Sequence, residues 1–164
     1  MPPESRPHPG TAVLRQARAD DAGPLTRLLL ASRAAAMPYL PRVHSDEDTL
    51  AWITHVVLPG TDVRVAELHQ DGGAVELAGF ISLDGGELEQ LYLSPDMRRR
   101  GIGTLLLAHA KESSPEGLSL YAFQRNTAAR AFYERHGFTA VAFDDGGRNE
   151  ENEPDVRYRW SPSG

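Results

Sequence analysis

The sequence has no cysteine among its 164 residues. Disulfides, thiolate metal sites and a cysteine nucleophile are therefore excluded, and the composition is typical of a reducing compartment. No run of residues approaches the ~18 apolar positions that a membrane span needs. Residues 1–10 carry four prolines and no apolar stretch, so we expect a flexible tail and not a secretory signal. These absences predict a soluble, cytoplasmic protein with no membrane partner.

Basic side chains are also in the minority, with 17 Lys and Arg against 23 Asp and Glu and a formal net charge of -6. No nucleic-acid partner is therefore expected, because such binding depends on a basic surface that neutralises phosphates. The six histidines show no spacing typical of a metal site, so we expect no metal. A hydrophobic content of 40% over this length predicts a single folded domain, residues 11–161.

Hydrophobic periodicity and turn residues predict the order of helices and strands. Helices are expected after Asp20 or Asp21, after Ser45, and over residues 101–112 and 126–136. Strands are expected over residues 11–17, 62–69, 74–83, 87–93, 117–123, 138–143 and 155–160. Residues 144–154 are polar and predict a loop. This order predicts an α/β or α+β fold in which helices flank a mixed sheet.

One segment combines three arginines with two glycines at the start of a predicted helix. The first turn of a helix offers unpaired N–H groups and the positive end of its dipole to an anion, and glycines allow a phosphate to approach the backbone. Arginines add bidentate phosphate donors, although a solvated charge run is the alternative. The segment consists of Arg98, Arg99, Arg100, Gly101, Ile102, Gly103 and Thr104.

This segment resembles the acyl-CoA-binding signature of the GNAT superfamily of N-acyltransferases, Arg/Gln-x-x-Gly-x-Gly/Ala. Arg98, Gly101 and Gly103 occupy the three signature positions, whereas Arg99 stands where relatives often carry glycine. Residues 126–138 resemble the second CoA-contacting segment of the family, Asn-x-x-Ala-x-x-Phe-Tyr-x-x-x-Gly-Phe. The resemblance implies a GNAT-like fold with a mostly antiparallel central sheet and acetyl-CoA as cosubstrate.

The resemblance also implies how the donor is held. The backbone of Leu91, Tyr92 and Leu93 is expected to bind the pantetheine arm and polarise the thioester carbonyl, where pairing with the next strand lapses. A fully paired central strand is the alternative. Asn126 is implied as a CoA contact and Tyr133 as the acid that protonates the leaving thiolate, the alternatives being a helix cap and a packed tyrosine.

Two glutamates are candidates for the general base. Glu87 and Glu89 alternate with Leu91 and Leu93, so strand periodicity predicts that all four side chains share one face. Partial burial would raise the pKa of such a carboxyl toward the range that suits amine deprotonation. A solvated strand edge is the alternative.

The acceptor pocket is expected between the first two helices. His44 lies in that connection, and Tyr39 and Trp52 flank it, so these three residues are the candidate substrate contacts. A surface histidine is the alternative for His44.

Taken with the resemblance, the sequence predicts an N-acetyltransferase that transfers an acetyl group from acetyl-CoA to a primary amine by direct attack in a ternary complex. The acceptor is an amine-bearing small molecule or a peptide, and a homodimer stays open. A non-catalytic CoA-binding module is the competing hypothesis. A dinucleotide-dependent oxidoreductase is disfavoured, because a third glycine and the acidic residue of a βαβ unit are missing.

Overall fold

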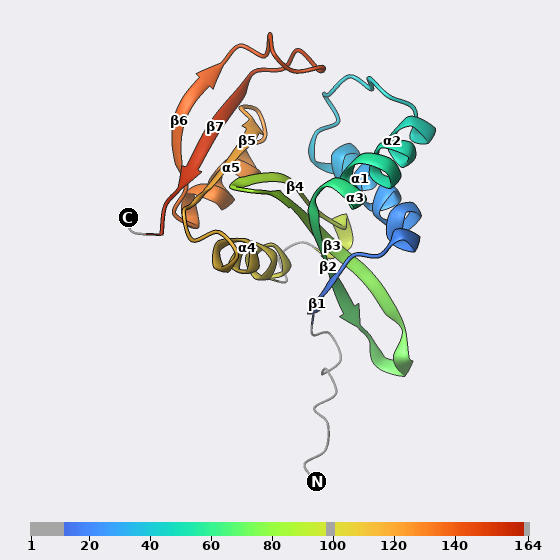
Figure 1. Cartoon of the computed structure of the whole chain (residues 1–164). Coiled ribbons are helices and arrows are strands. Elements are labelled where there is room, and N and C mark those ends of the chain that lie inside the picture. The colour runs from blue at the N-terminus through green and yellow to red at the C-terminus, as the bar shows by residue number, and fades with distance from the viewer. Residues whose placement is uncertain (1–11, 98–100, 163–164) are drawn as a thin grey trace.

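The computed structural model describes residues 12–97 and 101–162, so the expected tail and Arg98, Arg99 and Arg100 lie outside the described residues. A seven-stranded sheet has the order β1-β2-β3-β4-β5-β7-β6 (Figure 1). Only β4 and β5 pair in parallel among the described strands. The strands are β1 Ala12–Gln16, β2 Asp62–His69, β3 Val75–Asp84, β4 Glu87–Leu93, β5 Leu118–Phe123, β6 Thr139–Asp144 and β7 Asp155–Trp160.

Helices lie on both faces of this sheet (Figure 1). One face carries α1 and the helical segments between α1 and β2, and the other carries α4 and α5. This mixed sheet, flanked by helices, confirms the predicted fold class. The helices are α1 Ala22–Ala36, α2 Asp46–Trp52, α3 Leu58–Gly60, α4 Ile102–Glu112 and α5 Thr127–Arg135. Short 3₁₀ turns lie at Ala19–Asp21, Asp71–Gly73 and Pro95–Met97.

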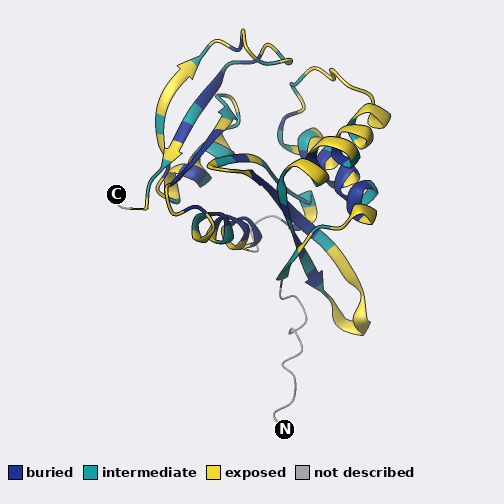
Figure 2. Cartoon of the chain, in the orientation of Figure 1, coloured by how far each residue is buried: buried dark blue, intermediate teal, exposed yellow. Residues whose placement is uncertain are grey.

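Two apolar layers hold the helices on the sheet. On one side Leu25 and Leu29 of α1 are buried against Phe80 of β3, and on the other Leu106 of α4 is buried with Ile81. Phe80 and Ile81 are adjacent in sequence, so they point to opposite faces of the strand, and β3 contributes to both layers. Burial colours show the same arrangement, with the buried residues concentrated between the sheet and its helices (Figure 2).

The second predicted helix differs in its interior. Ser45 caps α2 as expected, accepting a hydrogen bond from the Asp48 N–H at 3.1 Å. A π-helical turn, Ile53–Val57, then connects α2 to α3, and the helical path runs on to Gly60. Pro59 lies in the first turn of α3, where a proline needs no backbone hydrogen-bond donor, so it does not interrupt this path.

The start of α1 is fixed by an ion pair and not by a side-chain cap. Asp21 occupies the N-cap position, but its carboxylate accepts two hydrogen bonds from Arg15 of β1 at 2.8 Å. It also accepts one from the Arg18 N–H at 2.7 Å. The Arg15 guanidinium holds the pKa of Asp21 below its usual value of 3.8. The first strand is thereby tied to the first helix.

Within residues 12–97 and 101–162 no helix is long and apolar enough to cross a membrane.

Candidate active site

Strands β4 and β5 separate immediately after they meet. Their one recorded register pair joins Glu87 to Ser119, and the Ser119 N–H donates to the Gly86 carbonyl at 2.8 Å. Beyond that point the residues of β4 pair with β3 alone in the described part of the chain. The predicted lapse in pairing is present, and it leaves one edge of β4 open.

The open edge consists of the backbone N–H and C=O groups of Leu91 and Leu93. The Ser94 N–H donates to the Ala78 carbonyl of β3 at 2.8 Å, so the backbone groups of Ser94 and Tyr92 point toward β3. Antiparallel pairing alternates, so the backbone groups of Leu91 and Leu93 point away from β3, into the gap toward β5. Their side chains pack against the apolar layer below α4. Of the three residues expected to contact the donor through their backbone, Leu91 and Leu93 have backbone groups at the open edge, and those of Tyr92 face β3.

The N-terminus of α4 lies next in the chain after this strand. Gly101 has a φ of 76°, a left-handed conformation that glycine adopts without strain, and an added Cβ there would meet nothing within 4 Å. A Cβ at Gly103 would instead lie 3.2 Å from the Phe132 ring of α5. Gly103 thus permits close packing of α4 on α5. The Ile102 side chain is buried in the core, so this residue can offer an anion only its N–H. The Thr104 hydroxyl contacts His136 at 3.1 Å.

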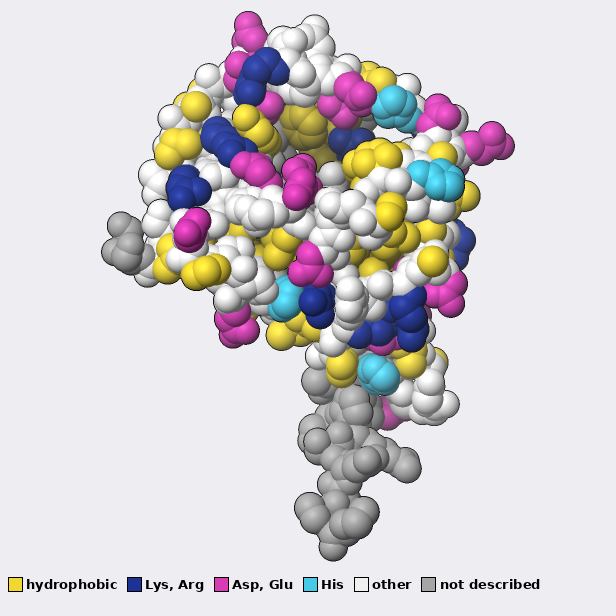
Figure 3. Space-filling view, viewed as in Figure 1, with side chains coloured by type: hydrophobic (Ala, Val, Ile, Leu, Met, Phe, Trp, Pro, Cys, Tyr) yellow, Lys and Arg dark blue, Asp and Glu magenta, His cyan; other side chains and the backbone are white. Residues whose placement is uncertain are grey.

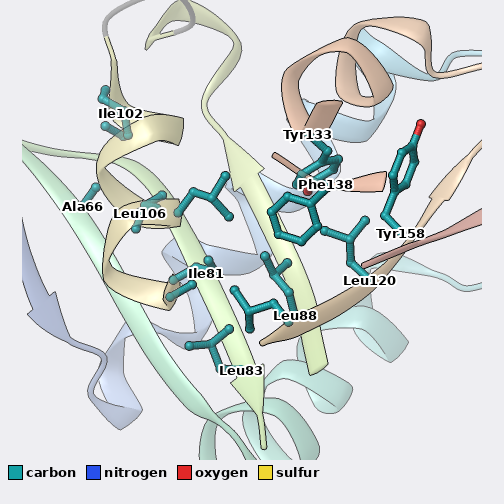
Figure 4. Close-up of a cluster of buried hydrophobic side chains, with 14 of the residues drawn as sticks. Ala66, Ile81, Leu83, Leu88, Ile102, Leu106, Leu120, Tyr133, Phe138 and Tyr158 are labelled. Atoms are coloured by element: carbon teal, nitrogen blue, oxygen red, sulfur yellow. The ribbon is translucent and has the colours of Figure 1, made fainter. Parts of the chain in front are cut away.

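Tyr133 is packed inside the molecule at the side of this gap. It is 8% exposed, and its ring lies against those of Phe138 and Tyr158 (Figure 4). The ring of Phe132 is a third aromatic neighbour. Burial, followed by the proximity of Tyr92, raises the pKa of Tyr133 far above its usual value of 10.0. The phenol is therefore protonated throughout the neutral range. Because burial disfavours the phenolate, Tyr133 is a weaker acid than an exposed phenol.

Asn126 is engaged as a helix cap. Its side chain accepts a hydrogen bond from the Ala129 N–H at 3.2 Å at the start of α5. The residue is the N-cap of α5 and lies one position before its first helical residue, Thr127. The capping alternative therefore describes the side-chain oxygen of Asn126. The side-chain nitrogen has no hydrogen-bond partner among the described residues.

A β-bulge overturns the expectation that both glutamates share a face with Leu91 and Leu93. Leu83 pairs with Leu88 and Ser82 pairs with Gln90, which leaves Glu89 as the extra residue on β4. Because one inserted residue shifts the alternation by one, Glu87 points to the face opposite Leu88 and Leu91. Strand periodicity alone could not reveal this bulge.

The two glutamates also differ in their partners. Both carboxylate oxygens of Glu87 accept hydrogen bonds from Arg157 of β7, one of them at 2.8 Å. Glu89 makes no recorded ion pair among the described residues. Glu89 is exposed, but partial desolvation of its carboxyl, together with the charges of Glu87 and Asp84, raises its pKa above the usual value of 4.5. Glu89 is thus the better candidate to accept a proton.

A cavity of about 910 Å³ opens on the α1 side of β4. Tyr92 and Gln90 contribute to it from the sheet, and His44 and Trp52, two of the candidate substrate contacts, line it from the helical side. A hollow between the β6–β7 side and helices α1 and α2 is visible in Figure 3. Tyr39 does not line it. The Tyr39 ring instead packs on the Arg125 guanidinium, 3.8 Å from ring centroid to the charge centre.

Three contributors to this cavity were not identified from the sequence. Arg33 lines it from α1, and Glu150 and Glu151 line it from the loop between β6 and β7. The two glutamates are more than a hundred residues from α1, and only the fold brings them together. No spacing rule could have found them.

No group of three or more His, Asp or Glu side chains in the described ranges is arranged to hold a metal ion.

The arrangement brings together the open strand edge at Leu91 and Leu93, the buried phenol of Tyr133 and the cavity lined by Tyr92. The open edge can hold an extended ligand and polarise its carbonyl. The cavity can admit a nucleophile from the opposite side. Such an arrangement can bring two substrates together for a direct transfer.

Comparison with known proteins supports this chemistry. A family model described as an acetyltransferase (GNAT) domain matches residues 59–140. Over 125 residues the chain is 31% identical to the peptidyl-lysine N-acetyltransferase YjaB of Salmonella typhimurium, covering 76% of this chain and 81% of that protein.

Two solved structures share the fold. The solution structure of apo-form YjaB from Escherichia coli has a TM-score of 0.73 at 22% identity, covering 92% of this chain and 97% of that one. PaiA N-acetyltransferase from Thermoplasma acidophilum, in complex with coenzyme A, has a TM-score of 0.65 at 20% identity, covering 92% and 99%. The chain therefore belongs to the GNAT family of acetyl-CoA-dependent N-acetyltransferases, as its two motifs predicted.

Proposed function

We propose that this enzyme transfers the acetyl group of acetyl-CoA to the side-chain amine of a lysine in a peptide or protein. The observation that carries the proposal is the open edge of β4, whose unpaired backbone at Leu91 and Leu93 adjoins the cavity lined by Tyr92. The choice of lysine is supported by the name of the 31% identical relative, a peptidyl-lysine N-acetyltransferase.

The donor would lie along β4 and end at α4. The N–H groups of Leu91 and Leu93 are the hydrogen-bond donors available to a pantetheine arm and a thioester carbonyl. The first turn of α4, beginning after Gly101, would receive the pyrophosphate, because its N–H groups have no partners within the helix. PaiA in complex with coenzyme A shares this fold, which supports acetyl-CoA as the occupant. Arg98, Arg99 and Arg100 belong to the same proposal and lie outside the described residues.

The chemistry would proceed by direct attack. The neutral amine nitrogen forms a bond to the thioester carbonyl carbon, the C–S bond breaks, and the thiolate takes the phenolic proton of Tyr133. The proton lost by the amine goes to Glu89, whose pKa is raised above its usual value of 4.5. Glu87 is held by Arg157 and serves to position the strand.

Turnover with defined acceptors tests the proposal. Lysine-containing peptides are compared with matched peptides in which that lysine is acetylated or replaced by arginine, and release of free CoA is measured. We expect turnover only where a free lysine amine is present. Binding of CoA without transfer to any amine would instead favour the non-catalytic module.

The remaining expectations form part of the same proposal. We place residues 11–161 in a single catalytic domain and the reaction in the cytoplasm, which is supported by the cysteine-free composition. The formal charge of -6 supports the absence of a nucleic-acid partner. Sedimentation of the purified protein would decide between a monomer and a homodimer.

A further inference from the structure

The loop between β6 and β7 reaches across the molecule to the helical side. Arg33 of α1 lies 3.1 Å from Glu151 of this loop. Nε2 of His44, in the α1–α2 connection, lies 2.7 Å from a carboxylate oxygen of Glu150. We call these two ion pairs the strap. They join residues that are 118 and 106 positions apart in the sequence.

The strap forms part of the wall of the proposed acceptor cavity. All four of its residues line the cavity, and Gln90 and Tyr92 of β4 line it from the sheet. An amine that approaches Tyr92 through this cavity must therefore pass beside the strap. In the view of Figure 3 the hollow is bordered by acidic and histidine side chains.

The loop keeps its shape through bonds of its own. The Asn149 amide donates to the Glu153 carbonyl at 2.7 Å and accepts from the Glu153 N–H at 3.0 Å. The Gly146 N–H donates to the Asp144 carboxylate at 2.9 Å. None of these bonds involves α1. The strap can therefore open without unravelling the loop.

The two ion pairs of the strap differ in exposure. The Glu151 side chain is 13% exposed, whereas those of His44 and Glu150 are 52% and 63% exposed. Exposed pairs contribute little and are screened by salt, so the outer pair opens more readily than the inner one. A further contact, between the Tyr39 ring and Arg125, spans the same gap, and Arg125 pairs with Glu153 of the loop.

We propose that the strap selects acceptors by size, an inference that rests on the lysine acetyltransferase activity proposed above. A small free amine fits whole into a cavity of about 910 Å³ while the strap is closed. A lysine in a protein brings its main chain and neighbouring residues with it, and the loop obstructs these until both ion pairs open. The strap is thus the gate for macromolecular acceptors.

The absence of native cysteine allows a direct test. In the full-length variant His44→Cys with Glu150→Cys, a short bis-maleimide linker that contains a reducible disulfide holds the strap closed, and reduction releases it. Turnover of a lysine-containing protein acceptor should fall about tenfold or more on cross-linking and recover on reduction, whereas a small primary amine should be turned over equally in the cross-linked and reduced forms. Unchanged turnover of the protein acceptor, or equal loss with both acceptors, would overturn the proposal.

A second pair of variants avoids the disulfide and does not depend on activity. Glu150→Gln with Glu151→Gln removes the carboxylate charges of the strap, and Asp46→Asn is the matched control, because Asp46 pairs with Arg42 of the α1–α2 connection and not with the loop. Hydrogen exchange of amides 146–153 should accelerate severalfold in the double variant and not in the control. If exchange is unchanged, the strap does not hold the loop. If no amine is acetylated by any variant, the proposed function fails, while this exchange measurement still decides the strap.

Discussion

Tyr133 and the strap lie on opposite sides of the proposed reaction centre and are held in different ways. The ring of Tyr133 has aromatic neighbours at centroid distances of 5.3, 5.6 and 6.2 Å and is almost completely buried. The strap consists of two ion pairs with partly exposed members. Close packing fixes a side chain at any ionic strength, whereas exposed ion pairs contribute ~0–1 kcal/mol and weaken in salt.

This contrast separates a rigid donor side from an adjustable acceptor side. The donor is acetyl-CoA in each reaction cycle, so its site can be rigid. Acceptors differ in size and charge, and weak contacts that open and close can admit them.

Tyr133→Phe should lower kcat by roughly 10²-fold or more, because it removes the proposed acid and leaves the ring packing in place. The affinity for acetyl-CoA, measured by calorimetry, should change little. Phe138→Leu, which alters the packing around the same ring without removing a proton, is the control. A Tyr133→Phe enzyme with normal kcat under chemistry-limited conditions would show that another group protonates the thiolate.

Asp21→Asn should lower the free energy of unfolding by about 2 kcal/mol, because it breaks a partly buried bidentate pair while Arg15 retains Glu67. The pKa of Asp21 is lower in the folded state than in the unfolded chain. Its contribution is therefore complete above the usual value of 3.8 and is lost as the pH falls through the lower folded value. Urea unfolding of both proteins at pH 7 and in acid measures this. An equal acid dependence in the two proteins would contradict the assignment.

Gly103→Val should lower the free energy of unfolding by about 1.5 kcal/mol, because the new side chain meets Phe132 across the α4–α5 contact. Gly60→Val is the matched control, since an added Cβ there meets nothing within 4 Å. Thermal unfolding of both variants should separate them. Equal stability would show that α4 and α5 can move apart, and the donor side would then be less rigid than proposed.

Glu89→Gln should reduce the rate about fivefold near neutral pH and displace the acidic limb of the kcat/KM profile. This limb should lie above pH 4.5, because the pKa of Glu89 is raised, and activity should fall as Glu89 becomes protonated. Glu87→Gln is the comparison. It should lower stability through loss of the Arg157 contact and leave the position of the limb unchanged. A profile identical in wild type and both variants would remove glutamate as the base.

The sequence predicted most of the donor side because its signals are local. Gly101 marks a left-handed residue at a helix start, and the predicted lapse of pairing beside Leu93 is found where β4 leaves β5. The sequence was less informative about the orientation and partners of individual side chains. The bulge at Glu89 changes the face of Glu87, and the side-chain oxygen of Asn126, a residue implied as a CoA contact, caps α5. Both depend on hydrogen bonds to particular neighbours and not on periodicity.

The sequence by itself thus determined the family, the order of helices and strands, and the two CoA-related motifs, because each depends on residues close together in the chain. Only the tertiary structure decided how the acceptor side is built. Arg33 meets Glu151 and His44 meets Glu150 because the sheet order places the β6–β7 loop opposite α1. It also decided that Tyr39 packs on Arg125 and does not line the cavity. Contacts between residues more than a hundred positions apart leave no periodic pattern in the chain, so they become visible only in the fold.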